Sequence, residues 1–149
     1  MSSEQLPEKI KEIAMELDDA LEKRDYELIK SHFTKDCKIE FLDVTLRGRK
    51  GVEKWLDYIF EHVKAFKLKP ILIMVENDSF FEEFIVIATL PDGSKISSKW
   101  AEVLVYKNYK IQSLRLYFDR LNFIKSIASN ILIKKLLKYL DKKSLEGLN

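Results

Sequence analysis

The sequence predicts an α+β fold in which helices cover one face of a curved antiparallel β-sheet and enclose a cone-shaped pocket. Three observations support this fold class. Apolar residues recur at helical spacing in the first third of the chain, four long strand-like segments follow, and helical spacing returns near the C-terminus. With 149 residues, 46% of them hydrophobic, the chain fits a single domain over residues 1–149.

The first third of the chain predicts three helices and one strand. Pro7 suits the first turn of a helix, and apolar residues then follow at three- and four-residue steps. Asp25 can cap a second, short helix. The predicted elements are helices over 7–24, 26–33 and 51–66, a strand over 37–44 and a bend over 47–51.

The middle of the chain predicts a sheet of successive antiparallel strands. A turn is expected at residues 91–93, and Asn108 with Tyr109 is typical of a tight hairpin. Residues 121–149 alternate apolar residues with lysines, as an additional C-terminal amphipathic helix with a frayed tail would. The predicted strands span residues 68–77, 79–90, 95–107 and 109–119.

Charge and cysteine content exclude several classes of protein. The 26 basic and 24 acidic residues give a net charge of +2, so no broad field attracts nucleic acid. The single cysteine, Cys37, excludes an internal disulfide and multi-cysteine zinc sites. No segment reaches the roughly 18 apolar residues of a membrane span, and the N-terminus lacks a signal peptide pattern. We therefore predict a cytoplasmic protein with neither a nucleic-acid partner nor a membrane span.

No metal or cofactor is predicted. His32 and His62 lie far apart, and neither has metal-ligand spacing to Cys37 or to nearby acids. They are interpreted as solvated or helix-end histidines, and Cys37 as a small buried residue.

The last predicted strand carries a family resemblance. The segment "GSKISSKWAEVLVYKNYKIQSLRLYFDRLNF" contains a strand, a tight turn with "KI" and a strand that ends in R-x-Y-F-D. This order resembles the SnoaL-like branch of the nuclear-transport-factor-2-like superfamily over residues 7–124, with a C-terminal helical extension over about 121–145. Limonene-epoxide hydrolases, polyketide cyclases and ketosteroid isomerases share this fold. The resemblance implies a cone-shaped pocket and a homodimer formed through the outer face of the sheet.

Most catalytic positions of these relatives do not carry over. The epoxide hydrolases hold water with an arginine and two aspartates, and Glu83, Ile85 and Leu116 occupy the corresponding positions. The ketosteroid isomerases use an aspartate base at the end of the first strand, where the nearest alignment places Phe41. Asp43, two residues further on, enters that role only if the alignment slips.

Asp119 matches the aspartate that the resemblance assigns to acid–base chemistry in the SnoaL cyclases. A carboxyl in an apolar pocket can have its pKa raised toward neutrality, as such chemistry requires. The alternative is that Asp119 caps the last helix. Arg115 and Tyr117 fall on the opposite face of the strand from Leu116, which favours a dimer contact for both.

Glu102 is the second candidate acid. Ser98, Trp100 and Glu102 share one face of their strand, and the spacing to the last strand turns that face toward the pocket. Trp100 could stack on a flat ligand. The alternatives are that Trp100 belongs to the core and that Glu102 pairs with Lys99 or Lys110. The predicted pocket residues are Phe41, Trp55, Tyr58, Ile85, Ile87, Ser98, Trp100, Leu114, Leu116 and Phe118.

Three functions remain open. The first is a pocket protein that binds or transforms a small apolar molecule by carboxylate acid–base chemistry, as an isomerase, cyclase or hydrolase. The second is a non-catalytic dimeric module that binds a ligand or a protein. In the third, the C-terminal helix docks on another protein; its lysines also suit a solvated face, a packed lid or a membrane-surface helix.

Overall fold

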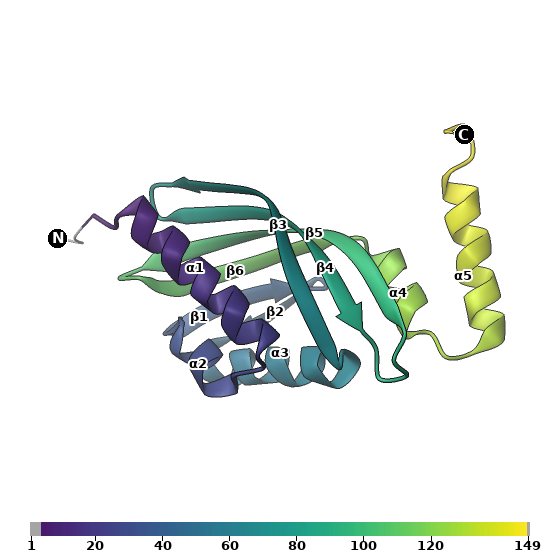
Figure 1. Cartoon of the computed structure of the whole chain (residues 1–149), viewed down its shortest axis with the longest axis horizontal. Coiled ribbons are helices and arrows are strands. Elements are labelled where there is room, and N and C mark those ends of the chain that lie inside the picture. Colours follow the sequence, from purple (N-terminus) through teal and green to yellow (C-terminus); the bar gives the residue numbers. More distant parts are fainter. Residues whose placement is uncertain (1–3, 149) are drawn as a thin grey trace. The chain divides into compact units, whose positions relative to one another are not determined.

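A computed structural model describes residues 4–148 and divides the chain into two units at Phe118 (Figure 1). The first unit contains three helices and six strands, and the second, from Asp119 on, contains two helices. No helix in the described part of the chain is long and apolar enough to cross a membrane.

The first unit begins with the three predicted helices. Asp25 caps the second, since its carboxylate accepts the backbone N–H of Leu28. The third begins at Gly48, before the predicted start, because the glycines of the expected bend belong to it. A Cβ on Gly51 would lie 2.8 Å from the carbonyl carbon of Leu46, so glycine permits this close approach. The helices are α1 (Pro7–Glu22), α2 (Tyr26–Ser31) and α3 (Gly48–His62).

The strands form one curved, unclosed sheet in the order β2-β1-β6-β5-β4-β3. The three successive antiparallel pairings predicted for β3 to β6 are confirmed, whereas β1 and β6 pair in parallel. Strand β2 was not predicted; a tight turn at Leu42 and Asp43, both with positive φ, folds it back on β1. The strands are β1 (Phe33–Phe41), β2 (Val44–Arg47), β3 (Ala65–Glu76), β4 (Ser79–Thr89), β5 (Lys95–Lys107) and β6 (Lys110–Phe118).

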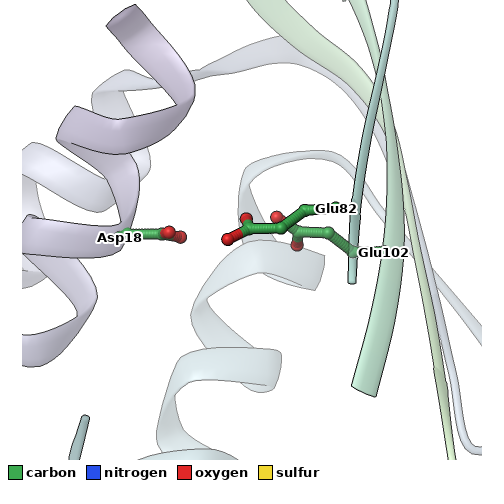
Figure 2. A group of neighbouring side chains, drawn as sticks. All are labelled: Asp18, Glu82 and Glu102. Atoms are coloured by element: carbon green, nitrogen blue, oxygen red, sulfur yellow. The ribbon is translucent and has the colours of Figure 1, made fainter. Parts of the chain in front are cut away.

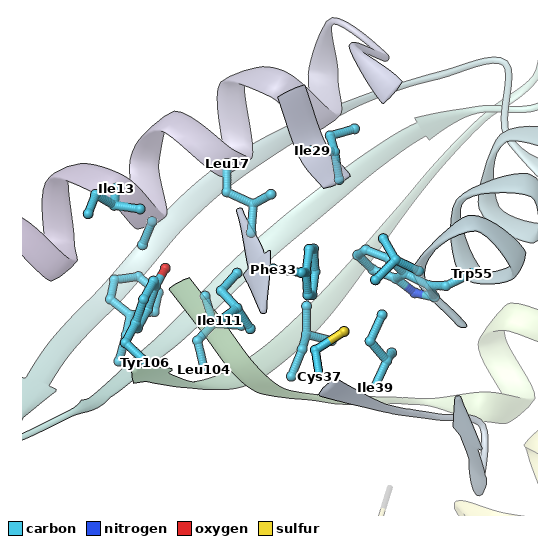
Figure 3. Close-up of a cluster of buried hydrophobic side chains, with 14 of the residues drawn as sticks. Ile13, Leu17, Ile29, Phe33, Cys37, Ile39, Trp55, Leu104, Tyr106 and Ile111 are labelled. Carbon is cyan, nitrogen blue, oxygen red and sulfur yellow. The ribbon is translucent and has the colours of Figure 1, made fainter. Parts of the chain in front are cut away.

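The core of this unit lies between the helices and the inner face of the sheet (Figure 3). Because side chains alternate along a strand, one set from each strand faces the helices. In β5 this set is Trp100, Glu102, Leu104 and Tyr106. The most buried core residues include Ile10, Leu17, Ile29, Ile39, Leu56, Phe80, Leu104, Ile111 and Leu114.

Polar side chains fix helix α1 on the sheet at both ends. The buried amide of Gln5 donates to Asp78 Oδ1 at 2.6 Å and to the carbonyl of Tyr106 at 3.0 Å, and accepts the N–H of Tyr109 at 2.7 Å. At the other end, Glu22 accepts the backbone N–H of Leu68 at 2.8 Å. The position of every side chain on α1 relative to the sheet depends on these contacts.

The second unit contains two helices where the sequence predicted one. Helices α4 (Arg120–Ile127) and α5 (Ile131–Ser144) are separated by a short extended segment. Asn130 is the N-cap of α5, because its side chain accepts hydrogen bonds from the N–H groups of Leu132 and Ile133. A new helix therefore starts there, and the segment is not one continuous helix. Lys125 and Asp141 join the two helices by an ion pair of 2.8 Å.

The substitution Gln5→Ala is expected to lower the free energy of unfolding by about 2 kcal/mol, because it removes three long-range hydrogen bonds of a buried side chain. Urea denaturation followed by circular dichroism measures the change. Gln112→Ala, at the other glutamine of the chain, is the control and should change stability by less than about 0.5 kcal/mol. Equal effects of both substitutions would contradict the anchoring role of Gln5.

Candidate functional site

Three carboxyl groups meet on the inner face of the sheet (Figure 2). Glu82 of β4 and Glu102 of β5 are directly paired across the two strands. Asp18 of α1 faces both of them, and carboxylate oxygens from the three residues all lie within 4.8 Å of one another. Glu82 is 1% exposed and Glu102 is 7% exposed, so two members of this carboxyl triad are removed from water.

Local sequence explains why each carboxyl points inward. Glu82 lies between Phe80 and Phe84 on the side of β4 that builds the core. Asp18 follows Ala14 by one helical turn, and therefore lies at the edge of the apolar stripe of α1. The fold thus forces three acids into positions that normally hold apolar side chains.

Burial without a basic partner raises the pKa of all three groups. Asp18 reaches a pKa of about 8, first through burial and then through the negative charges of Glu82, Glu22 and Asp19. Burial raises the pKa of Glu82 to about 7, although hydrogen bonds from Glu102 and Asp18 act in the opposite direction. Burial, followed by the charges of Asp18 and Glu82, raises the pKa of Glu102 well above its ordinary value.

The charged groups that act on these carboxyls are all carboxylates themselves. Two ionised carboxylates directly opposite each other on paired strands repel, so at neutral pH the triad must retain protons. A carboxyl that keeps its proton near pH 7 can donate a hydrogen bond or a proton, and an ionised neighbour can accept one. Carboxylate oxygens also suit hard divalent cations as ligands. Assays of this site therefore include a chelator, which removes such cations.

Tyr106 extends the polar group along β5. Its side chain is 2% exposed, and its hydroxyl points toward α1 (Figure 3). Burial and the charges of Glu102 and Asp18 raise its pKa above the ordinary value. Within residues 4–148, the hydroxyl of Tyr106 and Oε1 of Glu82 are buried without a hydrogen-bond partner. Both atoms therefore retain unused capacity to bind a polar group.

Aromatic rings continue the same face of the sheet beyond the triad. Trp100 and Phe118 stack with ring centroids 4.0 Å apart and an interplanar angle of 10°. Phe41 contacts Phe118 at 5.6 Å and Tyr58 at 5.7 Å, and Phe84 lies 6.4 Å from Trp100. This aromatic row (Phe41, Tyr58, Phe84, Trp100 and Phe118) gives the site a flat apolar neighbour.

Several predicted pocket residues share this face, but not all of them do. The strand register aligns Ser98, Trp100 and Glu102 of β5 with Val86, Phe84 and Glu82 of β4. Ile85 and Ile87 alternate with these residues and face the opposite side of the sheet, so their assignment to the pocket was wrong. Leu116 and Phe118 of β6 pair with Glu102 and Trp100. Phe41, Trp55 and Leu114 are buried in the core.

Glu102 does not have the lysine partners considered from the sequence. Lys99 alternates with Glu102 and is exposed on the other side of the strand. Lys110 donates to the carbonyl of Ser31 at 2.6 Å. The charged groups that act on Glu102 are the acids Asp18 and Glu82, so Glu102 stays buried by keeping its proton rather than by forming an ion pair.

The other two candidate acids lie outside the triad. Asp119 is exposed and caps α4, since its carboxylate accepts the N–H of Asn122 at 3.2 Å. Asp43 is exposed in the tight turn between β1 and β2. A catalytic part for either residue stays a prediction, and the capping of α4 is the role that the structure assigns to Asp119.

Comparison with known proteins identifies the family. The SnoaL-like domain matches residues 15–114. The chain belongs to the SnoaL-like family. No curated protein matches this SnoaL-like chain.

Solved structures share the α+β fold of this chain. A protein of unknown function from Burkholderia pseudomallei has a TM-score of 0.74 at 16% identity, over 81% of this chain and 98% of that one. A proposed SnoaL-like polyketide cyclase from Jannaschia has a TM-score of 0.74 at 12% identity, over 87% and 99%. TerC, co-crystallised with polyporic acid, has a TM-score of 0.72 at 18% identity, over 81% and 99%.

Asp18 and Glu82 were not predicted as site residues, although the sequence contains signals for both. Asp18 breaks the apolar stripe of α1, and Glu82 shares strand parity with Phe80 and Phe84. Strand alternation turns only one of the adjacent residues Glu82 and Glu83 inward. The family resemblance pointed to Glu83, so the inward position of Glu82 was missed.

The triad makes stability depend on pH. Unfolded carboxyls lose their protons near pH 4, whereas folded Glu82 keeps its proton to a pH of about 7. Between these values the folded chain binds more protons, so its stability falls as pH rises. Between pH 4.5 and 8, the free energy of unfolding of the Glu82→Gln variant should fall by about 2 kcal/mol less than that of the wild type.

Urea denaturation at several pH values measures this difference. Glu83→Gln, on the opposite face of β4, is the matched control and should follow the wild-type curve. Parallel curves for Glu82→Gln and the wild type would show that Glu82 titrates normally in the folded chain.

Proposed function

We propose that this protein catalyses proton transfer on a small apolar molecule, as an isomerase or cyclase that uses the carboxyl triad. The observation that carries the proposal is a group of three acids whose carboxylate oxygens lie within 4.8 Å of one another, two of them buried, with burial as the largest cause of the raised pKa of each. Groups whose pKa values lie near the working pH are those that exchange protons efficiently.

The raised pKa values suggest a division of roles. Glu82, with a pKa of about 7, is ionised often enough at neutral pH to act as the base. Asp18, with a pKa of about 8, keeps its proton to higher pH than Glu82 does, and Glu102, whose pKa is raised well above its ordinary value, joins it as a donor. Glu82 would remove a proton from a carbon beside a carbonyl, the C–H electron pair would form an enolate, and Glu102 would donate its hydrogen bond to the enolate oxygen.

The fate of the enolate separates the two reaction types. Return of the proton from Glu82 to a different carbon moves a double bond, which is an isomerisation. Attack of the enolate carbon on a second carbonyl of the same molecule closes a ring, and the new alkoxide takes a proton from Glu102. Both sequences conserve protons and need no redox partner.

The aromatic row supports a flat apolar substrate. Trp100 and Phe118 are stacked on the same face as the triad and are only partly buried. The similarity to a proposed polyketide cyclase and to TerC with polyporic acid is consistent with this class of molecule. We infer an unsaturated or polyketide-like carbonyl compound as the substrate.

Hydrogen–deuterium exchange at carbons beside a carbonyl tests the reaction. A panel of cyclic and aromatic ketones and 1,3-diketones would be incubated with the protein in D₂O and EDTA and followed by NMR. The wild type should accelerate exchange for at least one compound, and Glu82→Gln should slow it about 100-fold or more. Glu83→Gln should retain wild-type rates. Unchanged exchange by Glu82→Gln on a compound that the wild type converts would refute the role of the triad.

The alternative function is a non-catalytic dimeric module. The exposed apolar residues on the outer face of the sheet support the formation of a dimer. Tyr117 and Met74 are each 53% exposed, and Leu72 is 45% exposed. The register turns all three, together with Arg115, away from the triad. Apolar side chains exposed on a sheet face are typical of a protein contact, and we propose a homodimer through this face.

Sedimentation velocity tests the dimer. The wild type should sediment as a dimer at micromolar concentration, and the double substitution Met74→Lys and Tyr117→Lys should shift it to a monomer by introducing like charges. Lys11→Glu is a surface control on α1 that should leave the dimer intact. A monomeric wild type would refute this proposal and leave the proton-transfer proposal unaffected.

A further inference from the structure

The second unit has a net positive charge, although the whole chain is nearly neutral. Residues 119–149 contain seven lysines and arginines and three acids, whereas residues 1–118 contain nineteen basic and twenty-one acidic residues. The near-neutral total therefore combines a basic C-terminal unit with a slightly acidic first unit. A basic segment of this size attracts anionic partners at short range, within about one Debye length of its surface.

Helix α5 divides its side chains by chemistry. At 100° per residue, Leu132, Leu136, Tyr139 and Leu140 share one sector of the helix, and Lys134, Lys138 and Lys142 lie on the other side. Lys135 borders the apolar sector, and Lys143 lies at its C-terminal end. The sector is open to water: Leu132 is 74%, Tyr139 is 60% and Leu136 is 56% exposed.

The contacts inside the second unit do not use this sector. Leu137 is the buried residue of α5, and Asp141, one turn later, pairs with Lys125 of α4. Both lie on the side of α5 away from Tyr139 and Leu132. Helix α4 therefore packs against another part of the circumference of α5 and leaves the apolar sector as a distinct surface.

We propose that α5 lies flat on an anionic membrane surface, with Leu132, Leu136, Tyr139 and Leu140 inserted at the boundary of headgroups and acyl chains. A helix with an exposed apolar sector bordered by lysines is the physical type that binds such surfaces. Its fourteen residues extend for about 21 Å, which suits lying in the interface rather than crossing it.

Charge favours lipid over a second copy of the same helix. Two α5 helices packed through their apolar sectors would bring Lys135 and Lys143 of both copies into the contact, because these lysines lie at the border and the C-terminal end of the sector. The one acid within the helix, Asp141, is already paired with Lys125. Lipid phosphates and carboxylates can pair with Lys135 and Lys143, whose long side chains reach the headgroups while their apolar stems stay on the acyl side.

Vesicle co-sedimentation of the full chain tests the proposal. Vesicles of phosphatidylcholine alone are compared with vesicles that contain 30% phosphatidylserine, at 0.1 and 0.5 M NaCl. The chain should partition at least tenfold more strongly to the anionic vesicles and lose most of that preference at high salt. The double substitutions Lys135→Glu with Lys142→Glu, and Leu132→Ser with Leu136→Ser, should each lower partitioning at least tenfold.

The matched control is Lys11→Glu with Lys54→Glu, which changes net charge equally on exposed residues of α1 and α3. It should retain most of the binding. Equal binding by the Leu132→Ser, Leu136→Ser variant would overturn the proposal, as would binding without preference for anionic lipid. If the wild type does not bind vesicles, and the Leu132→Ser, Leu136→Ser variant has a lower sedimentation coefficient than the wild type, the proposal is overturned. A second copy of the chain then covers the sector.

Discussion

The constraint on which this structure depends is the meeting of three acids, two of them buried, on the inner face of the sheet, where the charges that act on them within residues 4–148 are all carboxylates. The register of β4 and β5 sets Glu82 opposite Glu102, and α1 adds Asp18. Ionised carboxylates in such an arrangement repel and are desolvated, so the folded chain must hold protons there. The contacts that fix α1, at Gln5 and Glu22, also hold the triad together.

The chain has the SnoaL-like domain, and two members of its triad, Asp18 and Glu82, lie outside the positions that the family resemblance indicated. The resemblance predicts Glu83, Ile85 and Leu116 at the water-holding positions of the epoxide hydrolases, and isoleucine and leucine cannot accept a proton from water. The triad uses other positions, Glu82 and Glu102 on the sheet and Asp18 on α1. A shared fold therefore supplies a place for a site, and the side chains within it decide the reaction.

The sequence predicted much of the architecture because its signals were local. Helical spacing identified α1 and α3, the "NY" turn identified the hairpin between β5 and β6, and Asp25 identified the cap of α2. The triad was only partly predictable. Glu102 could be found from strand alternation, but its encounter with Asp18 depends on how a helix packs across a sheet 64 and more residues away. The break at Asn130 was missed because the apolar pattern continues on both sides of it.

The central claim is that the triad retains protons at neutral pH, and carboxyl titration by ¹³C NMR measures this most directly. Chemical shifts of the glutamate and aspartate carboxyl carbons would be followed from pH 3 to 10, with Glu82→Gln, Glu102→Gln and Asp18→Asn used to assign the signals. The account expects coupled titrations, with Glu82 near pH 7 and Asp18 near pH 8. Titration of all three carboxyls near pH 4, the ordinary value, would contradict it.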